Sequence, residues 1–538
     1  MTKSISKTYR LMAVVLLWAT GTAHAQSWLD YDQVLAHYPW IETTNPAVLS
    51  TYHPEDSTQN LLGDARLTLN TRQGNFVDPN TPPHVWSADG RVRSIYRMGP
   101  RVVLSGSMDY SYAWGSKAGG SVWIDPERMA FDITQTDDST RGNVNLETYR
   151  LTGKAGVDVG NGLSLGGSVE YSTASGAKRK DPRHTNSLMN CRVSAGASWQ
   201  TSGLTLGANY LYGRNTEALK FSTVGRTDRV YHYLINHGAY FGREESTDGN
   251  GYVGSTHERP WLDIRHGLAA QAGYRHDEWD WGIESTWVHR HGHYGLESPS
   301  MIDFNRHRGD EWCVMSWWQR DKGSSLMRFN IQYKHQAVKD FERTYRIITT
   351  NGVTDVTYYD DRLMSEVNKS EVLVTGNLRW GIRRQLPTWE LKASLVHRRR
   401  SLTASVFPYY RQQTAHLTGF DLNGMHSWLM TGDQTLSLVM NAGWSGGGGT
   451  VCLDGVYQIP ADNAMYPHDN QLYMMREFEY LTANRLNAGV SVRWSRPIAG
   501  QNIRLYLEGN YRYLQAFGID YLEGTTRHHL AMSVGCQF

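Results

Sequence analysis

The sequence predicts an all-β protein: one closed antiparallel transmembrane β-barrel of about 18 strands, with short periplasmic turns and long extracellular loops. Three observations favour this fold class. Apolar and polar residues alternate with a period of two along most of the chain, short and long connections alternate between those stretches, and the chain stops on an aromatic residue. Transmembrane barrels show this alternation because their strands have an apolar outer face and a polar inner face.

The first 25 residues predict a secretory signal peptide. Basic residues precede the apolar run Leu11–Trp18, and Ala23-His24-Ala25 forms an A-x-A cleavage site. The run is too short to cross a membrane as a helix. We therefore expect the mature chain to begin at Gln26 and to reach the cell outer membrane.

Composition excludes several classes of protein. A mean hydropathy of −0.52 excludes helical membrane spans. A net charge of +2 gives no reason to expect a nucleic-acid partner. The chain has 31 Tyr and 19 Trp but only 12 Phe, and Tyr and Trp prefer membrane interfaces. No linker divides the chain, so we expect one barrel over residues 65–538, preceded by a segment over residues 26–64.

Strands are predicted wherever apolar residues recur at every second position. In residues 163–172, Leu163, Leu165, Val169 and Tyr171 share one face, and small or polar residues share the other. Residues 204–212, 327–334 and 503–513 repeat this pattern. The last strand, 530–538, ends at Phe538, which we interpret as the signal that the barrel-assembly machinery of the outer membrane reads.

The connections predict two different ends of the barrel. Tight turns are expected at residues 99–100, 160–162, 201–203, 277–278, 321–323 and 431–433, and long irregular connections near 115–145, 213–265, 338–365 and 446–479. Within the third of these, Thr344–Tyr359 predicts a hairpin that turns at Asn351-Gly352. We expect the glycine run Gly446–Gly449 to begin a flexible loop. Aromatic girdles are expected near the turns (Trp199, Trp281, Trp389, Trp494) and near the loops (Trp114, Tyr212, Trp444).

Charged residues on the polar strand faces are candidates to line the lumen. They are Asp109, Glu170, Glu284, Arg328, Lys334, Arg379, Lys392, Arg493, Arg504, Glu508 and Arg512. A wet lumen tolerates charge, whereas the lipid face does not. Two interpretations stay open: a mixed-charge channel wall, or opposite charges that pair across strands and fill a closed lumen.

Two clusters could hold a metal ion. His289, His291 and His293 alternate along one strand, so one face could present three imidazoles; the alternative is a strand end with polar rings at the level of the lipid headgroups. Asp132, Asp137 and Asp138 could bind a divalent cation in a loop, or they could cap turns. We expect no other cofactor.

The sequence gives no reason to expect an enzyme. G-x-S-x-G occurs at residues 162–166 and 443–447, but both matches lie on alternating strands, whereas a nucleophile elbow needs a strand, a turn and a helix. No Ser, His and carboxylate set stands out. The four cysteines, Cys191, Cys313, Cys452 and Cys536, have no metal-type spacing, and the sequence leaves any disulfide pairing open.

Several short stretches resemble an uncharacterised family of Gram-negative outer-membrane β-barrel proteins. They include Gly119-Gly120-Ser121, Ile124-Asp125-Pro126, residues 137–142, Leu146–Tyr149 and Asp181–His184. The resemblance implies the barrel fold and the outer membrane but little about a substrate. Such proteins resemble accessory barrels that accompany TonB-dependent receptors, which makes such a receptor a candidate partner.

A second likeness concerns the segment before the barrel. Asn45, Pro46 and Ala47 near the mature start resemble the N-terminal hatch of barrels that carry long-chain fatty acids. That likeness implies a lumen plug over residues 26–64, with Trp40 and Tyr52 inside the barrel. The alternative is an extended periplasmic tail.

These observations predict passive or accessory transport of a small solute across the outer membrane. The charged lumen face and the large strand number favour it. The alternative is a non-conducting barrel whose long extracellular loops bind a ligand or a partner, as in an adhesin or receptor. Outer-membrane lipid is the expected surrounding in either case.

Overall fold

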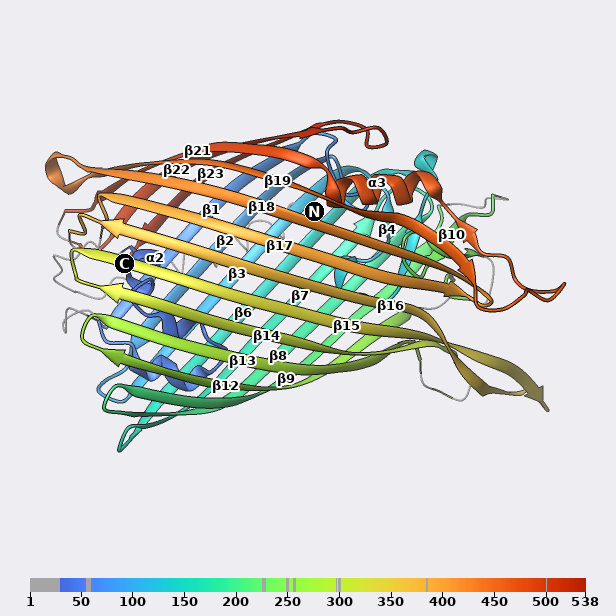
Figure 1. Ribbon diagram of the computed structural model, residues 1–538, viewed down its shortest axis with the longest axis horizontal. Coiled ribbons are helices and arrows are strands. Elements are labelled where there is room, and N and C mark those ends of the chain that lie inside the picture. Colours follow the sequence, from blue (N-terminus) through green and yellow to red (C-terminus); the bar gives the residue numbers. More distant parts are fainter. Residues whose placement is uncertain are drawn as a thin grey trace.

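The computed structural model describes residues 30–54, 60–224, 229–247, 251–254, 258–296, 298, 301–383, 386–499 and 501–538. The predicted signal peptide lies outside these residues. The described chain forms a closed antiparallel barrel of 18 strands, so the predicted fold class is confirmed. Figure 1 shows the strands inclined around the long axis, with folded segments inside the barrel at both ends.

Each barrel strand pairs with its neighbours along the wall in antiparallel register, and the last strand pairs with the first. The strands are β1 (Leu61–Gln73), β2 (His84–Arg97), β3 (Val102–Ala118), β6 (Gly142–Gly160), β7 (Leu163–Lys178), β8 (Arg183–Thr201), β9 (Leu204–Ser222), β12 (Arg259–His276), β13 (Trp279–Gly295), β14 (Asp303–Asp321), β15 (Ser325–Thr350), β16 (Val353–Trp380), β17 (Trp389–Val406), β18 (Tyr409–Leu429), β19 (Thr435–Val456), β21 (Asn484–Pro497), β22 (Arg504–Phe517) and β23 (Thr526–Gln537). Closure leaves no free strand edge in the wall, because every backbone ladder has a partner.

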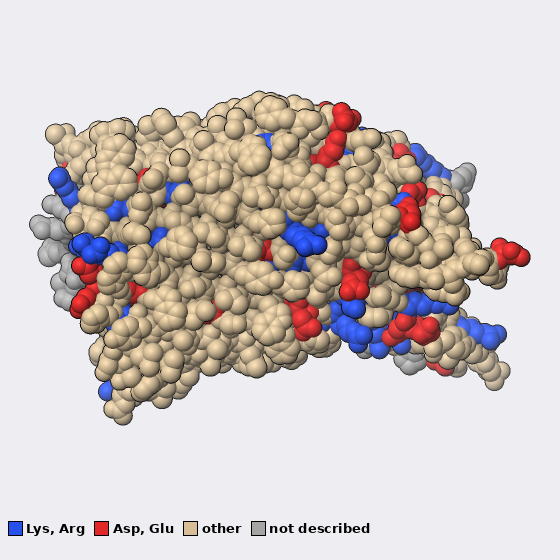
Figure 2. Space-filling view, viewed as in Figure 1, with Lys and Arg blue, Asp and Glu red and all other residues tan. Residues whose placement is uncertain are grey.

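The period-two pattern separates an outer and an inner face. On β7 the apolar residues Leu163, Leu165, Val169 and Tyr171 are exposed, whereas Ser164 is buried. The outer wall in Figure 2 is mostly uncharged; most Lys, Arg, Asp and Glu lie toward its two ends, and a small charged patch stands near the middle of this view. Exposed tryptophans stand near both ends, among them Trp114, Trp199, Trp281, Trp389 and Trp444. An uncharged band between aromatic girdles suits a lipid bilayer.

The two ends of the barrel have different connections, as predicted. The six predicted tight turns join β2–β3, β6–β7, β8–β9, β12–β13, β14–β15 and β18–β19. The hairpin at Thr344–Tyr359 is also confirmed, because Thr350 pairs with Val353 across Asn351-Gly352. Residues 338–365 are not irregular, however: β15 and β16 simply continue, since β-branched and aromatic residues there sustain strand pairing.

The glycine run Gly446–Gly449 is a second correction. It lies inside β19 and begins no loop. A Cβ at Gly447 would stand 1.8 Å from the carbonyl oxygen of His416, and Gly449 has a φ of +150°. The register with β18 shifts nearby, between Gln412 and Thr414. Glycine is needed here because the two backbones approach closely at a bulge.

Segments inside the barrel fill its two ends. At the short-turn end lie α2 (Tyr31–Leu35), η1 (Pro39–Glu42) and η2 (Pro46–Thr51). At the other end an inner sheet contains β4 (Gly120–Ser121), β5 (Asp132–Gln135), β10 (His232–Asn236), β11 (Phe241–Ser246) and β20 (His468–Asp469), with η3 (Pro126–Arg128), η4 (Asp138–Thr140) and α3 (Gln471–Thr482) beside it; η5 (Thr431–Asp433) is a turn of the wall. Among the described residues, no helix is long and apolar enough to cross a membrane.

The inner sheet is held by an apolar core against the barrel wall. Trp123, Phe131 and Ile133 of the inner sheet and its loops pack with Trp261 and Tyr294 of the wall. A second core joins Tyr473 and Met474 of α3 to Leu402, Ala404 and Val406 of β17. Burial of such side chains stabilises by roughly 1.5–3 kcal/mol each, which fixes the long connections inside the barrel mouth.

Candidate functional site

All eleven charged residues predicted to line the lumen lie on the inner strand face. Arg328, for example, stands between the exposed residues Met327 and Phe329. The same alternation with exposed apolar residues places Asp109, Glu170, Glu284, Lys334, Arg379, Lys392, Arg493, Arg504, Glu508 and Arg512 on that face. The inner face is therefore charged along much of the barrel circumference.

Several of these charges pair across neighbouring strands. Asp109 pairs with Arg91, Glu170 lies 3.6 Å from Arg192, and Arg379 lies 3.2 Å from Glu390. Arg504 donates instead to the hydroxyls of Ser495 and Thr435 at 2.7 and 2.8 Å. Some of the lumen charges thus pair across strands, as the second of the two interpretations expected.

Three other lumen charges hold the N-terminal segment, which comprises residues 30–54. Arg328 pairs with Glu42 at 2.8 Å, and Arg493 pairs with Asp30 at 2.9 Å. The carboxylate of Glu284 accepts a hydrogen bond from the Thr44 amide at 2.9 Å. These contacts come from β13, β15 and β21, so the segment is held from different sides of the wall.

Asn45 and Trp40 are two buried side chains of the N-terminal segment that contact the wall. Asn45 is 1% exposed; its amide donates to Ala197 O at 2.9 Å and to Gln271 Oε1 at 3.0 Å. Its Oδ1 accepts from the Ala47 amide, which caps η2. Trp40 packs edge-on against Trp317 of β14, with ring centroids 4.8 Å apart.

Three glycines of the wall lie directly beneath η2 and its N-cap. Gly156, Gly166 and Gly196, which we call the glycine patch, lie on β6, β7 and β8. A Cβ at Gly166 would stand 2.4 Å from the Ala47 nitrogen, and one at Gly156 would stand 2.7 Å from the Ser50 nitrogen. Real Cβ contacts are longer, so the glycine patch is what lets η2 lie directly on the wall.

The inner face of β13 shows the order of these parts along the barrel. Asp280 and Glu284, near its start, bind Trp40 and Thr44 of the N-terminal segment. Thr286 and Val288 come next and line a cavity. Arg290 follows and donates to Arg128 O of η3 at 2.8 Å. The cavity therefore lies between the N-terminal segment and the inner sheet.

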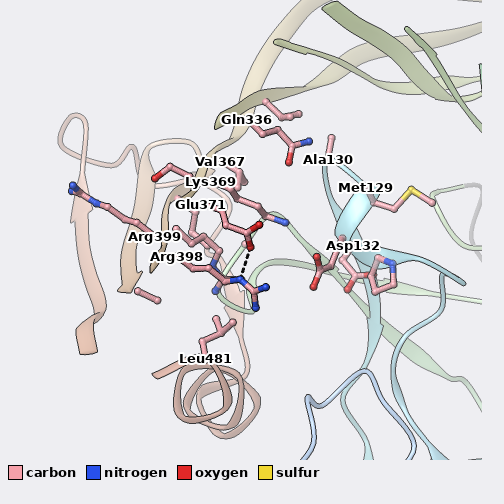
Figure 3. A pocket seen from close by; sticks show the side chains of 18 of the residues that line it. Met129, Ala130, Asp132, Gln336, Val367, Lys369, Glu371, Arg398, Arg399 and Leu481 are labelled. Atoms are coloured by element: carbon pink, nitrogen blue, oxygen red, sulfur yellow. Dashed lines mark hydrogen bonds and ion pairs between the residues drawn. The ribbon is translucent and has the colours of Figure 1, made fainter. Parts of the chain in front are cut away.

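This cavity, which we call the chamber, has a volume of ≈ 1140 Å³. Its wall side carries cations from three adjacent strands, namely Lys334, Lys369, Arg398 and Arg400. Its inner side carries carboxyls from the long connections, namely Asp78, Glu127 and Asp132. Figure 3 shows Lys369 and Arg398 extending from the wall toward the side that carries Asp132.

Only some of the chamber charges are neutralised by a neighbour. Arg398 pairs with Glu371 at 2.6 Å, and Arg400 pairs with Glu477 of α3 at 2.9 Å. Within the part of the chain that the structure describes, neither Lys334 nor Lys369 has a carboxylate within 4.0 Å. The two lysines thus present free ammonium groups to the chamber.

The carboxyls on the inner side have displaced pKa values. Burial, helped by the neighbouring Glu477 carboxylate, raises the pKa of Asp78 to about 7. Burial raises the pKa of Asp132 to about 8, although Ser121 donates a hydrogen bond to its carboxylate. A nearby cationic group would favour the ionised form of both carboxyls.

His237 is a polar side chain of the chamber lining that has no partner. It follows β10 and is 2% exposed, and among the described residues neither of its ring nitrogens has a hydrogen-bond partner. Burial lowers its pKa to about 3, so the ring is neutral at neutral pH. A buried imidazole without a partner is costly unless a ligand or water satisfies it.

The predicted metal clusters lie elsewhere. His289, His291 and His293 share one face of β13, as the spacing required, but that face is the outer one, opposite to Arg290. The rings of His289 and His291 stack with centroids 6.0 Å apart. No group of three His, Cys, Asp or Glu among the described residues could hold a metal ion. The metal hypothesis therefore stays a prediction that this geometry does not support.

The predicted aspartate cluster is also dispersed. Asp137 caps η4 by accepting from the Ser139 amide at 2.8 Å, and Asp138 lies 3.0 Å from Arg141. Asp132 alone reaches the chamber. The four cysteines are free thiols, and Cys452 lies in β19 although the sequence indicated a loop.

The sequence matches one family over residues 48–538, which is most of its length. The chain belongs to a family of unknown function, DUF6850. An uncharacterised family was expected, and that part of the resemblance is confirmed. The likeness of Asn45-Pro46-Ala47 to fatty-acid transporters is not shown. No protein of curated function matches this DUF6850 chain.

Solved structures with a similar outline are large outer-membrane proteins. The RagAB peptide importer has a TM-score of 0.41 at 8% identity, over 90% of this chain and 87% of that chain. The ferric preacinetobactin receptor BauA of Acinetobacter baumannii has a TM-score of 0.40 at 10% identity, over 88% of this chain and 80% of that chain. The outer-membrane transporter YddB of Escherichia coli has a TM-score of 0.38 at 7% identity, over 88% of this chain and 81% of that chain.

Most residues of the chamber were not predicted from the sequence. Lys369 is an even number of residues from Arg379 on the same strand, and Arg398 is an even number from Lys392. Because Arg379 and Lys392 were assigned to inner faces, the period-two pattern could have found Lys369 and Arg398 as well. Asp78 and His237 gave no such signal, because they lie in long connections and only the folding of those connections into the barrel brings them to the chamber.

Proposed function

We propose that this DUF6850 chain is an outer-membrane barrel that passes a small polar solute through its lumen by way of the chamber. The observation that supports this most is the chamber itself, ≈ 1140 Å³ and lined by unpaired charges. Sites for drug-sized ligands have volumes of roughly 300–1,000 Å³. The chamber thus has room for such a solute, and the free ammonium groups of Lys334 and Lys369 supply polar contacts.

The N-terminal segment serves as a plug in this proposal. Its contacts with the wall, such as the ion pairs Glu42–Arg328 and Asp30–Arg493, are made by side chains and not by strand pairing, so it can leave while the barrel ladders stay intact. The inner sheet and α3 line the opposite end, so in this proposal the N-terminal segment is the part that must move for passage. The lumen therefore acts as a gated path and not as an open pore.

The location and partners follow from the same proposal. The short-turn end faces the periplasm, the long connections face outward, and the predicted signal peptide directs export. The exposed apolar band contacts outer-membrane lipid. Energy for plug removal is available from a TonB-dependent receptor complex, which remains the candidate partner, together with the assembly machinery. No catalytic role is proposed.

A second function is favoured by one observation: both ends of the lumen hold folded segments. The protein would then capture a ligand at the extracellular end without passing it, as a receptor or adhesin. The inner sheet and α3, which come from the connections near 213–265 and 446–479, would form that binding surface.

Two measurements on the detergent-extracted barrel test these functions. Single-channel conductance in planar bilayers should be low for the native protein and should appear as stable steps when residues 30–54 are deleted. Uptake of small solutes into liposomes should change in parallel. A folded barrel that shows neither conductance nor uptake, before and after the deletion, would overturn transport; ligand binding without uptake would favour the receptor.

A further inference from the structure

We propose that the chamber binds zwitterionic solutes, that is, molecules of the amino-acid or short-peptide type that carry a separated carboxylate and ammonium group. This rests on the proposed function and specifies its substrate class. The geometry that points to it is a cavity with cations on one side and carboxyls on the other. A zwitterion is the class of solute whose two charges match both sides at once.

The basic side is a continuous surface formed by three adjacent strands. In the first row, Lys334 of β15 lies opposite Glu371 of β16, which in turn lies opposite Arg398 of β17. In the next row, Lys369 of β16 lies opposite Arg400 of β17. Two carboxylates accompany them, Glu371 beside Arg398 and Glu477 beside Arg400. Both lysines remain free among the described residues, which leaves this side positive and suited to a carboxylate.

The acidic side comes from connections far apart in sequence. Asp78 lies between β1 and β2, Glu127 lies in η3, and Asp132 begins β5. Of these, Asp132 accepts from Ser121 Oγ at 2.6 Å and Asp78 accepts from the Asn80 amide at 2.8 Å, so each is held in place by a neutral donor. Because neither donor carries a charge, each carboxyl, once ionised, has its charge available for a ligand ammonium group.

The unpartnered ring of His237 adds an independent sign of a ligand. It is buried in the chamber lining and can donate one hydrogen bond and accept another. The backbone of a peptide offers both a carbonyl and an N–H. Both ring nitrogens are themselves buried, so a solute reaches the imidazole only when the connection that carries His237 shifts toward the chamber.

Triglycine and its blocked forms are the probes that test this. The full-length protein in detergent is titrated calorimetrically with triglycine, its N-acetyl derivative, its C-terminal amide and the doubly blocked peptide. Triglycine should bind about tenfold more tightly than either singly blocked probe, since one charge-assisted contact is lost in each. The doubly blocked peptide should bind most weakly.

Three variants assign the two sides. Lys369→Met should remove the preference for a free carboxylate, and Asp132→Asn should remove the preference for a free ammonium group. Arg399→Met is the matched control, because Arg399 is next to Arg398 but points away from the chamber (Figure 3). Heat-modifiable migration in gels checks that each variant remains a folded barrel.

The pH dependence gives a second test. Burial raises the pKa of the Asp132 carboxyl to about 8 and that of Asp78 to about 7; the charged neighbours are Glu477 and Asp78 for Asp132, and Glu477, Arg400 and Glu127 for Asp78. An ammonium group requires the ionised carboxyl, so triglycine affinity should rise from about pH 5.5 to about pH 7.5, before its own amine deprotonates at roughly 7.7–8.0. N-acetyl-triglycine should show no such rise.

The outcomes separate this inference from the proposed function. Selective binding of triglycine, lost at the expected variants, supports both. Equal or tighter binding of a blocked probe, or absence of binding by any probe while liposomes still take up other small solutes, overturns the zwitterion assignment and leaves transport intact. Absence of both binding and uptake in a folded barrel overturns both.

Discussion

Asn45 shows how a single side chain can hold a whole segment in the lumen. It satisfies two wall acceptors and caps η2, and it has almost no solvent exposure. Replacing it leaves buried partners unpaired, and each such loss costs about 1–3 kcal/mol. The side chain therefore sets the stability of the docked N-terminal segment more than that of the barrel.

Asn45→Ala should loosen the N-terminal segment by about 1–3 kcal/mol while the barrel remains folded. Limited proteolysis of the extracted protein should then cleave within residues 30–54 faster than in the native protein, with unchanged heat-modifiable migration. Asn60→Ala is the control, because that side chain is exposed just before β1. Equal cleavage rates in both variants would contradict this role for Asn45.

The fate of individual residues was predicted unevenly from the sequence. Parity placed Arg328 and Lys334 on the inner face, because a strand leaves a side chain only two directions. The alternation also placed the three histidines of β13 on one face of the strand. It could not tell whether that face was the inner or the outer one, because Trp287 and Val288, which lie on opposite faces just before the histidines, are both apolar. Partners such as Glu42 for Arg328 depend on tertiary contacts that no local pattern encodes.

At the scale of elements, the docking of η2 depends on the glycine patch. The structure brings Gly156, Gly166 and Gly196 side by side through the registers β6–β7 and β7–β8. Alternation predicted the strands that carry them, but glycine on an inner face gave no sign of an element lying above. The helical turns of the N-terminal segment were likewise not predicted, because their side chains fit contacts with the wall and show no helical periodicity of their own.

Gly166→Val should displace η2 and open the short-turn end of the barrel. A Cβ there would meet the Ala47 nitrogen at 2.4 Å, a backbone atom that cannot turn aside. Stable conductance steps in planar bilayers are the expected result. The control is Gly167→Val, whose Cβ would point outward with its nearest neighbour at 3.9 Å; it should conduct as the native protein does. Identical traces for the two variants would refute the docking argument.

For the whole molecule, the features that recur around the wall could be predicted from the sequence, whereas the inner sheet, which occurs once, could not. Strand number, the two kinds of end and the aromatic girdles recur around the wall, so errors average out. The inner sheet draws β4, β5, β10, β11 and β20 from three separate connections. Such pairing joins strands far apart in sequence, and no local propensity indicates it.

Phe538 extends the β1–β23 ladder that closes the barrel. Gly63 and Phe538 exchange backbone hydrogen bonds of 2.6 and 3.1 Å, and the Phe538 ring covers Gly63, where a Cβ would stand 2.3 Å from it. Deleting Phe538 should lower the yield of folded barrel in outer-membrane fractions several-fold, measured by heat-modifiable migration. Phe517→Ala, at the far end of β22, should leave the yield unchanged. A normal yield without Phe538 would remove its role as an assembly signal.

The hairpin at the end of β15 and β16 extends beyond its neighbours. Pairing with β14 ends at Glu342 and pairing with β17 ends at Ser365, so the tip at Asn351-Gly352 stands roughly 25 Å farther out at 3.3 Å per residue (Figure 1). A peptide epitope inserted there should be labelled by antibody on intact cells without loss of the barrel. The hairpin thus offers a handle for surface display, and its labelling would fix which way the protein faces.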